Sequence, residues 1–312
     1  MTLHRETFSA MGSPCELLLA PAGPIDLHRA ARAVVLDIQR LEQRYSRYRH
    51  DSDLAALNRV AAAGGSTTVD DETAALLDYA AACHAQSGGR FDITSGLLRQ
   101  VWRWGSGQLP TREAVAELLP RIGWQHVVWQ RPHLRFTVPG MELDFGGIVK
   151  EYAADRAAAW LLDAGVQHGL VNLGGDVRAL GPQPGGEPWR VGVRHPQRPG
   201  GLLATVALHQ GALASSGDYE RCIVVDGVRH GHILDPRTGW PVQGLAAVSV
   251  AAPLAVVAGS ATTIAMLMGP DGPAWLAQSG LPHLWVAVDG RSGGPLLNDA
   301  AADTRDPIPP TP

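Results

Sequence analysis

The chain lacks the features that would assign it to nucleic acid, to a membrane or to the outside of the cell. Its 26 lysines and arginines are outnumbered by 30 aspartates and glutamates among 312 residues, so the formal net charge of -4 leaves no basic excess for a nucleic-acid partner. No run of about 18 apolar residues offers a membrane span. The first residues have no basic stretch followed by an apolar stretch, as a secretory signal would. We therefore expect a cytoplasmic protein that acts on a small molecule or another protein.

Cysteine pairs and several widespread catalytic motifs are also missing. Cys15, Cys83 and Cys222 are far apart and form no CxxC pair, which predicts reduced thiols instead of a zinc site or a disulfide framework. The patterns GxxxxGK[ST] and GxGxxG do not occur, which argues against a Walker loop and a dinucleotide-binding Rossmann domain. Because GxSxG and HExxH are absent too, an unrelated α+β hydrolase is a poor interpretation.

The chain does contain alternating helix and strand patterns typical of an α+β fold. Hydrophobic residues make up 45% and charged residues 18%, as in ordinary globular proteins. Apolar spacing and end signals predict helices over 24–45, 70–86 and 147–162. Short strand-like runs are 169–173, 189–195, 203–209, 221–225, 246–252 and 283–288. We expect one domain over 1–298 and a disordered tail over 299–312, which is rich in proline and small residues.

Several segments combine glycines with charged side chains. Asp144, a Gly-Gly turn and Lys150 stand at the mouth of the third predicted helix, where free backbone N–H groups attract anions. Similar combinations are LVNLGGD, SGGRFDITSG and ASSGD. The stretch with the most histidine and charged side chains is RHGHILDPRTGWPV. Each of these motifs, taken alone, more often forms a turn or caps a helix than binds a ligand, since glycine suits positive φ and aspartate caps N–H groups. Their combination in this order is more informative than any one of them.

In that combination the sequence resembles the ApbE family of FAD:protein FMN transferases. The similarity runs over about residues 8–290, and HILDPRTG together with LVNLGGD is its most specific part. The resemblance implies one α+β unit of two intimate lobes around an FAD tunnel. It also implies an enzyme that binds FAD, splits its pyrophosphate with the help of Mg²⁺ and transfers FMN to a threonine or serine hydroxyl. The acceptor would be a target flavoprotein, and AMP would be released.

The resemblance assigns roles to individual residues. His232 matches the proposed general base, and an imidazole titrates near neutral pH. The positions that match FAD contacts are Met11, Tyr48, Arg90, Phe91, Asp92, Asp144, Lys150 and Ile233. Tyr48 would stack, residues 90–92 would meet the adenosine half mainly through backbone atoms, and Lys150 would suit a phosphate. Asp235, Arg237 and Thr238 would lock the loop by mutual hydrogen bonds or act directly.

The predicted metal site departs from the family pattern. Gly147 would offer a backbone carbonyl and Thr263 a hydroxyl, but Gly259 stands where the family usually has an aspartate. Glu151 replaces the usual glycine after the motif lysine and could supply the missing carboxylate. Two hypotheses follow: a working transferase with an altered metal site, or an FAD-binding relative with weakened or lost transfer. If the ion lacks a ligand, Gly259→Asp should restore it.

Overall fold

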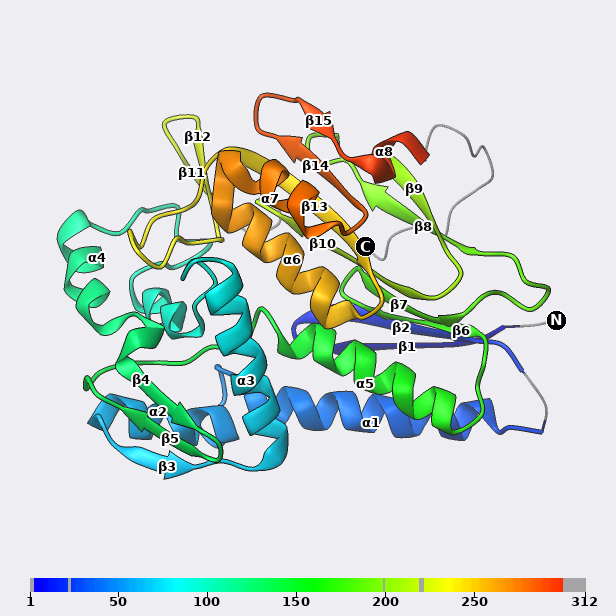
Figure 1. Ribbon diagram of the computed structural model, residues 1–312, viewed down its shortest axis with the longest axis horizontal. Helices are drawn as coiled ribbons and strands as arrows, with labels where there is room; N and C mark the ends of the chain where they lie inside the picture. The colour runs from blue at the N-terminus through cyan, green and yellow to red at the C-terminus, as the bar shows by residue number, and fades with distance from the viewer. Residues whose placement is uncertain (1–2, 22–23, 199, 219–221, 300–312) are drawn as a thin grey trace.

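A computed structural model describes residues 3–21, 24–198, 200–218 and 222–299 (Figure 1). Its centre is an eight-stranded sheet in which every neighbouring pair is antiparallel. In spatial order the strands are β1 (His4–Ala10), β2 (Ser13–Leu19), β6 (Gly169–Leu173), β7 (Asp176–Gly181), β10 (Gly211–Gly217), β13 (Leu245–Ala252), β14 (His283–Ala287) and β15 (Ser292–Gly293). The predicted α+β class is confirmed, because long helices accompany this antiparallel sheet.

Three long helices lie side by side along the sheet (Figure 1). They are α1 (Leu27–Tyr45), α5 (Val149–Asp163) and α6 (Ala255–Met268). The opposite face of the sheet is covered by the hairpin of β8 (Trp189–Arg194) and β9 (Leu202–Leu208) with α8 (Pro295–Asp299), around a separate apolar cluster that includes Trp189. The strand β6, near the middle of the sheet, is therefore buried on both faces, which explains why it is apolar along almost its whole length, whereas alternate residues of the edge strand β1 are exposed.

The remaining elements gather at one end of the molecule (Figure 1). They are α2 (Asp53–Ala63), β3 (Ser66–Thr68), α3 (Asp71–Gln86), η1 (Ile93–Gln100), α4 (Arg112–Leu118), η2 (Leu119–Arg121), η3 (Trp124–His126), β4 (Val127–Gln130) and β5 (His133–Phe136). Two further groups complete the described elements. One is the hairpin of β11 (Cys222–Val225) and β12 (Val228–Gly231), and the other consists of η4 (Gly269–Asp271) and α7 (Gly272–Ser279), which contact α6. One apolar cluster contains residues of α1, α2, α3, α5 and α6, so this end shares its core with the sheet.

The sequence-based boundaries agree with these elements to within three residues, and the largest difference is the start of α1, which lies at Leu27 instead of the predicted residue 24. The three predicted helices are α1, α3 and α5, and the six predicted strands are β6, β8, β9, β11, β13 and β14. Asp26 and Asp70 accept hydrogen bonds from Arg29 N and Thr73 N at 3.0 and 2.8 Å, and these caps set where α1 and α3 begin. Residues 300–312 of the predicted tail lie outside the described residues, whereas Asp299 ends α8. None of the helices in the described ranges is both long and apolar enough to cross a membrane.

Candidate functional site

Two tight turns of the central sheet meet next to the start of α5. Met11, in the β1–β2 turn, has a φ of 53° and donates its backbone N–H to Glu42 Oε1 at 2.6 Å. Gly174, in the β6–β7 turn of the LVNLGGD motif, has a φ of 62°, and a β-carbon there would lie 2.9 Å from Ser13 Cβ. Only glycine fits this close approach. A positive φ is strained for Met11, which is not a glycine, and the hydrogen bond to Glu42 holds it in this conformation. The sequence did not indicate Glu42 as a partner.

Lys150 lies between two carboxylates. Its Nζ donates to Asp176 Oδ2 and lies 3.0 Å from Glu151 Oε1. Asp176 Oδ1 also accepts the backbone N–H of Ser215 at 3.0 Å, which joins β7 to β10 at this point. The predicted phosphate-binding lysine is thus positioned by the aspartate of LVNLGGD, whose side chain is almost fully buried.

The first turn of α5 packs directly on α6. Gly259 lies beneath Glu151, so that a β-carbon at Gly259 would be 2.5 Å from Glu151 Cγ and 2.9 Å from its Cδ. One turn further along α6, Thr263 Oγ1 is 3.5 Å from Ser216 Oγ, which also shares a hydrogen bond of 2.8 Å with Thr262. Two of the predicted metal residues thus lie on α6. Thr263 presents its hydroxyl toward β10, and Gly259 leaves room for the Glu151 carboxylate from α5.

The start of α6 depends on a side chain from α5. Asp155 accepts the backbone N–H groups of Ala255 and Val256 at 2.8 and 2.9 Å, and its Oδ1 lies 3.1 Å from Arg178 Nε. Burial raises the pKa of Asp155, although these three donors favour the ionised form. Leu254, the residue before α6, provides no side-chain cap. Asp155 therefore replaces a local cap and fixes α6 against α5, a role that sequence spacing could not reveal.

Asp144 and Tyr48 are linked by Arg47. Arg47 Nη1 donates to Asp144 Oδ2, and its Nη2 donates to Tyr48 Oη at 2.9 Å while the guanidinium lies 5.0 Å from the centre of the tyrosine ring. Tyr48 is 77% exposed, so its ring is not part of the core. An exposed ring held by an arginine is available for stacking on a ligand. Arg47 is a further residue of this region that the sequence did not single out.

The SGGRFDITSG motif packs against the same region. Phe91 is buried, and a β-carbon at Gly147 would meet its ring at 3.3 Å. The Asp92 carboxylate accepts from Thr94 N at 2.8 Å, Thr94 Oγ1 at 2.7 Å and Trp124 N at 2.9 Å. The Phe91 and Asp92 side chains thus maintain the fold. The expected contact of residues 90–92 with the adenosine half of FAD stays a prediction.

The HILDPRTG loop is held from within. Asp235 accepts the backbone N–H and Nε of Arg237, each at 2.9 Å, and Nη2 at 2.6 Å, while Thr238 Oγ1 accepts Trp240 N at 3.2 Å. Burial opposes ionisation of Asp235, but the bonds from Arg237 outweigh it and lower the pKa of this carboxyl. The predicted mutual locking is confirmed for Asp235 and Arg237, whereas the Thr238 side chain bonds to Trp240 instead.

Replacing Asp235 with alanine should lower the free energy of unfolding by about 1 kcal/mol, because three bonds disappear but Arg237 is solvent-exposed. Arg237→Met removes the ion pair and keeps the backbone N–H bond, so its loss should be smaller. Urea unfolding of both variants measures the difference. Equal losses would mean that the backbone bond contributes nothing to the loop.

His232 immediately follows β12, whose last residue, Gly231, packs against Asp218. A β-carbon at Gly231 would lie 2.9 Å from Asp218 Cβ at the end of β10. Asp218 Oδ1 is buried and has no hydrogen-bond partner among the described residues, and burial raises the pKa of this side chain. Ser216, two residues earlier, contacts Thr262 and Thr263. β10 thus connects the proposed base with the proposed metal residues, and Ile233 packs against the main core.

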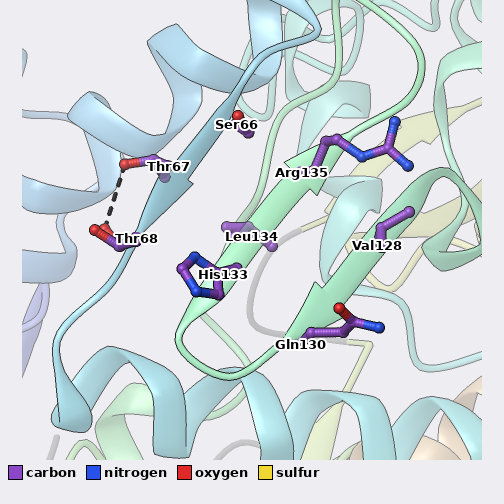
Figure 2. A pocket seen from close by; sticks show the side chains of 8 residues that line it. All are labelled: Ser66, Thr67, Thr68, Val128, Gln130, His133, Leu134 and Arg135. Carbon is purple, nitrogen blue, oxygen red and sulfur yellow. Dashed lines mark hydrogen bonds between the residues drawn. The ribbon is translucent and has the colours of Figure 1, made fainter.

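A separate surface pocket does not involve any of these residues. It has a volume of 340 Å³ and lies on the three-stranded sheet β3–β5–β4 (Figure 2). Its lining consists of Ser66, Thr67, Thr68, Val128, Gln130, His133, Leu134 and Arg135. None of the motif residues is among them, so this pocket is not the candidate site.

Comparison with known sequences agrees with the motifs. A model of the ApbE family matches residues 11–285. The FAD:protein FMN transferase of Treponema pallidum is 32% identical over 304 residues, covering 90% of this chain and 83% of that protein. The FAD:protein FMN transferase of Haemophilus influenzae is 28% identical over 255 residues, covering 78% and 73%.

Comparison with solved structures gives the same result. The ApbE protein of Thermotoga maritima superposes with a TM-score of 0.87 at 31% identity, covering 94% of this chain and 97% of that one. The apo form of the flavinyl transferase ApbE of Pseudomonas stutzeri gives 0.86 at 28% identity, covering 97% and 98%. The sequence match, the fold and the arrangement of the motifs agree, and the chain belongs to the ApbE family.

Proposed function

We propose that this chain is an FAD:protein FMN transferase. The observation that carries the proposal is that motifs far apart in the sequence meet around the start of α5. Lys150 contacts Asp176 of LVNLGGD, Gly147 lies against Phe91 of FDITSG, and Glu151 covers Gly259 of α6. Relatives that cover most of this chain carry the same activity in their names. A two-lobed arrangement around an FAD tunnel is part of the proposal.

In the proposed reaction, an acceptor hydroxyl oxygen attacks the phosphorus of the FMN half of FAD. The bond between this phosphorus and the bridging oxygen breaks, and AMP leaves with that oxygen. His232 takes the proton of the threonine or serine hydroxyl. Lys150 and the N–H groups at the start of α5 hold the phosphates. Mg²⁺, when bound, neutralises phosphate charge. Two oxygen atoms suit this ion: the Thr263 hydroxyl and the buried Glu151 Oε2, which has no hydrogen-bond partner in the described part of the chain.

The test of this activity is release of AMP that depends on an acceptor. The chain is incubated with FAD, Mg²⁺ and a flavoprotein domain that bears a flavinylation motif, and AMP is quantified by chromatography. AMP should appear with the intact acceptor and not with an acceptor whose target threonine or serine is alanine. Equal AMP with both would indicate hydrolysis of FAD instead of transfer.

The alternative is an FAD-binding relative without transfer, favoured by the single fact that α6 has Gly259 in place of a carboxylate. Such a protein would bind FAD and release no AMP under any metal concentration. The contact of Glu151 with Gly259 favours the transferase, because a carboxylate is present at this point of the site.

The chain should bind FAD more tightly than FMN, since residues proposed to meet the adenosine half and the flavin half are both present. Arg90, which flanks the buried Phe91, would contribute only to FAD binding. Titration followed by flavin fluorescence gives both dissociation constants, and Arg90→Ala should narrow the difference. Equal affinities of the parent for FAD and FMN would contradict the proposed mode of binding.

A further inference from the structure

The two departures from the family pattern, Gly259 and Glu151, are in direct contact. Glu151 is 6% exposed and belongs to the first turn of α5, whereas Gly259 is buried in α6. A β-carbon at Gly259 would lie 2.5 Å from Glu151 Cγ, 2.9 Å from Cδ and 3.1 Å from Oε1. The Glu151 carboxyl group therefore fills the volume that a side chain at Gly259 would occupy. A carboxylate on α5 and a glycine on α6 form one complementary pair.

One oxygen of this carboxylate lacks a hydrogen-bond partner within the described ranges. Glu151 Oε1 lies 3.0 Å from Lys150 Nζ, but Oε2 is buried and makes no hydrogen bond with any described residue. A buried carboxylate oxygen left without a donor is costly, and a cation is one way to satisfy it. The orphaned atom therefore points to a positively charged ligand.

The neighbouring donors are of the kind that a hard divalent cation prefers. Thr263 Oγ1 lies one turn along α6 from Gly259, and no described backbone N–H donates to the carbonyl of Gly147, which precedes α5. Carboxylate, hydroxyl and carbonyl oxygens suit Mg²⁺. The charges fit as well: Glu151 and Asp176 carry two negative charges against the single positive charge of Lys150. With a divalent ion bound, these three side chains and the ion together carry one net positive charge, which suits binding of a pyrophosphate.

We propose that Glu151 is the anionic ligand of the Mg²⁺ site in this chain, supplied from α5 in place of a side chain at position 259. This inference rests on the proposed function for the identity of the ion. It changes the expectation for Gly259→Asp: the new side chain would clash with Glu151 and place two carboxylates together, so metal binding should weaken.

The test measures metal binding without any acceptor. Mn²⁺ serves as the probe, followed by electron paramagnetic resonance of the free ion, alone and with saturating FAD, with Mg²⁺ as competitor. His4, Glu6 and His28 place their ligand atoms within 4.8 Å of one another and could bind Mn²⁺ separately. All variants therefore carry His28→Ala, an exposed position outside the proposed site.

Glu151→Gln keeps the shape of the side chain and should weaken Mn²⁺ binding about tenfold or more, because it removes the charged ligand. Gly259→Asp alone should not tighten binding. The double variant Glu151→Gly with Gly259→Asp moves the carboxylate to α6 and should bind within about threefold of the parent. Asp163→Asn, at an exposed position near the end of α5, is the matched control and should bind as the parent does.

Three results would overturn the inference: a parent that binds no Mn²⁺ in either condition, a Glu151→Gln variant with parental affinity, or tighter binding by Gly259→Asp alone. The melting temperature of each variant shows whether it is folded, and the double variant keeps the test valid if Glu151→Gln unfolds. Because no acceptor is present, a chain that binds Mn²⁺ through Glu151 but transfers no FMN would support this inference and contradict the proposed function.

Discussion

Replacing His232 with alanine should reduce FMN transfer by about 10²- to 10⁴-fold, the usual contribution of a positioned general base. FAD affinity should change little, because a base acts on the acceptor proton in the transition state and adds little to ground-state binding. The bonds between Asp235 and Arg237 remain in the variant, so the loop should persist. Single-turnover transfer rates and a separate FAD titration measure the two effects.

His209→Ala is the matched control, since this exposed histidine lies between β9 and β10 and is outside the proposed site. It should transfer FMN at the parental rate. If His232→Ala also transferred at the parental rate, another group would be taking the proton. A large loss of FAD affinity in that variant would instead assign His232 to binding.

The second large effect concerns stability. Replacing Asp155 with alanine should lower the free energy of unfolding by about 3 kcal/mol, because it uncaps α6 and leaves Arg178 without its partner carboxylate. The carboxylate is mostly buried, and it accepts the N–H groups of Ala255 and Val256 at 2.8 and 2.9 Å. Urea unfolding monitored by circular dichroism provides the measurement.

Asp155→Asn retains one acceptor oxygen and should lose less stability than alanine. Asp163→Ala, an exposed substitution on the same helix, should stay within about 0.5 kcal/mol of the parent. If Asp155→Ala were no less stable than Asp163→Ala, α6 would not depend on the α5 side chain for its start.

Local signals in the sequence predicted the elements that local physics determines. Apolar spacing predicted the end of α1 at Tyr45 and placed its start three residues before Leu27, whereas both ends of α3 were predicted within one residue. The strand β6 was predictable from a short apolar run. The resemblance placed Gly147, Lys150 and Thr263 near one another, and their elements do pack together around the start of α5.

What the sequence could not predict are contacts between side chains on separate elements. Asp155 caps a helix that begins 100 positions later, and Arg47 pairs with Asp144 across 97 positions. No local pattern encodes such partners, because they depend on how α5, α6 and the loops pack. For the same reason, Gly259 read alone suggested a damaged ion site, whereas its contact with Glu151 shows that a carboxylate from another helix fills the space.

The covalent state of an acceptor flavoprotein tests the central claim most directly. The chain, FAD, Mg²⁺ and an acceptor domain are incubated together, and the acceptor is analysed by intact-mass spectrometry. The account predicts an acceptor that has gained one FMN in phosphoester linkage to its threonine or serine, with one AMP released for each adduct. An acceptor of unchanged mass, in a sample where the chain has bound FAD and Mg²⁺, would contradict it.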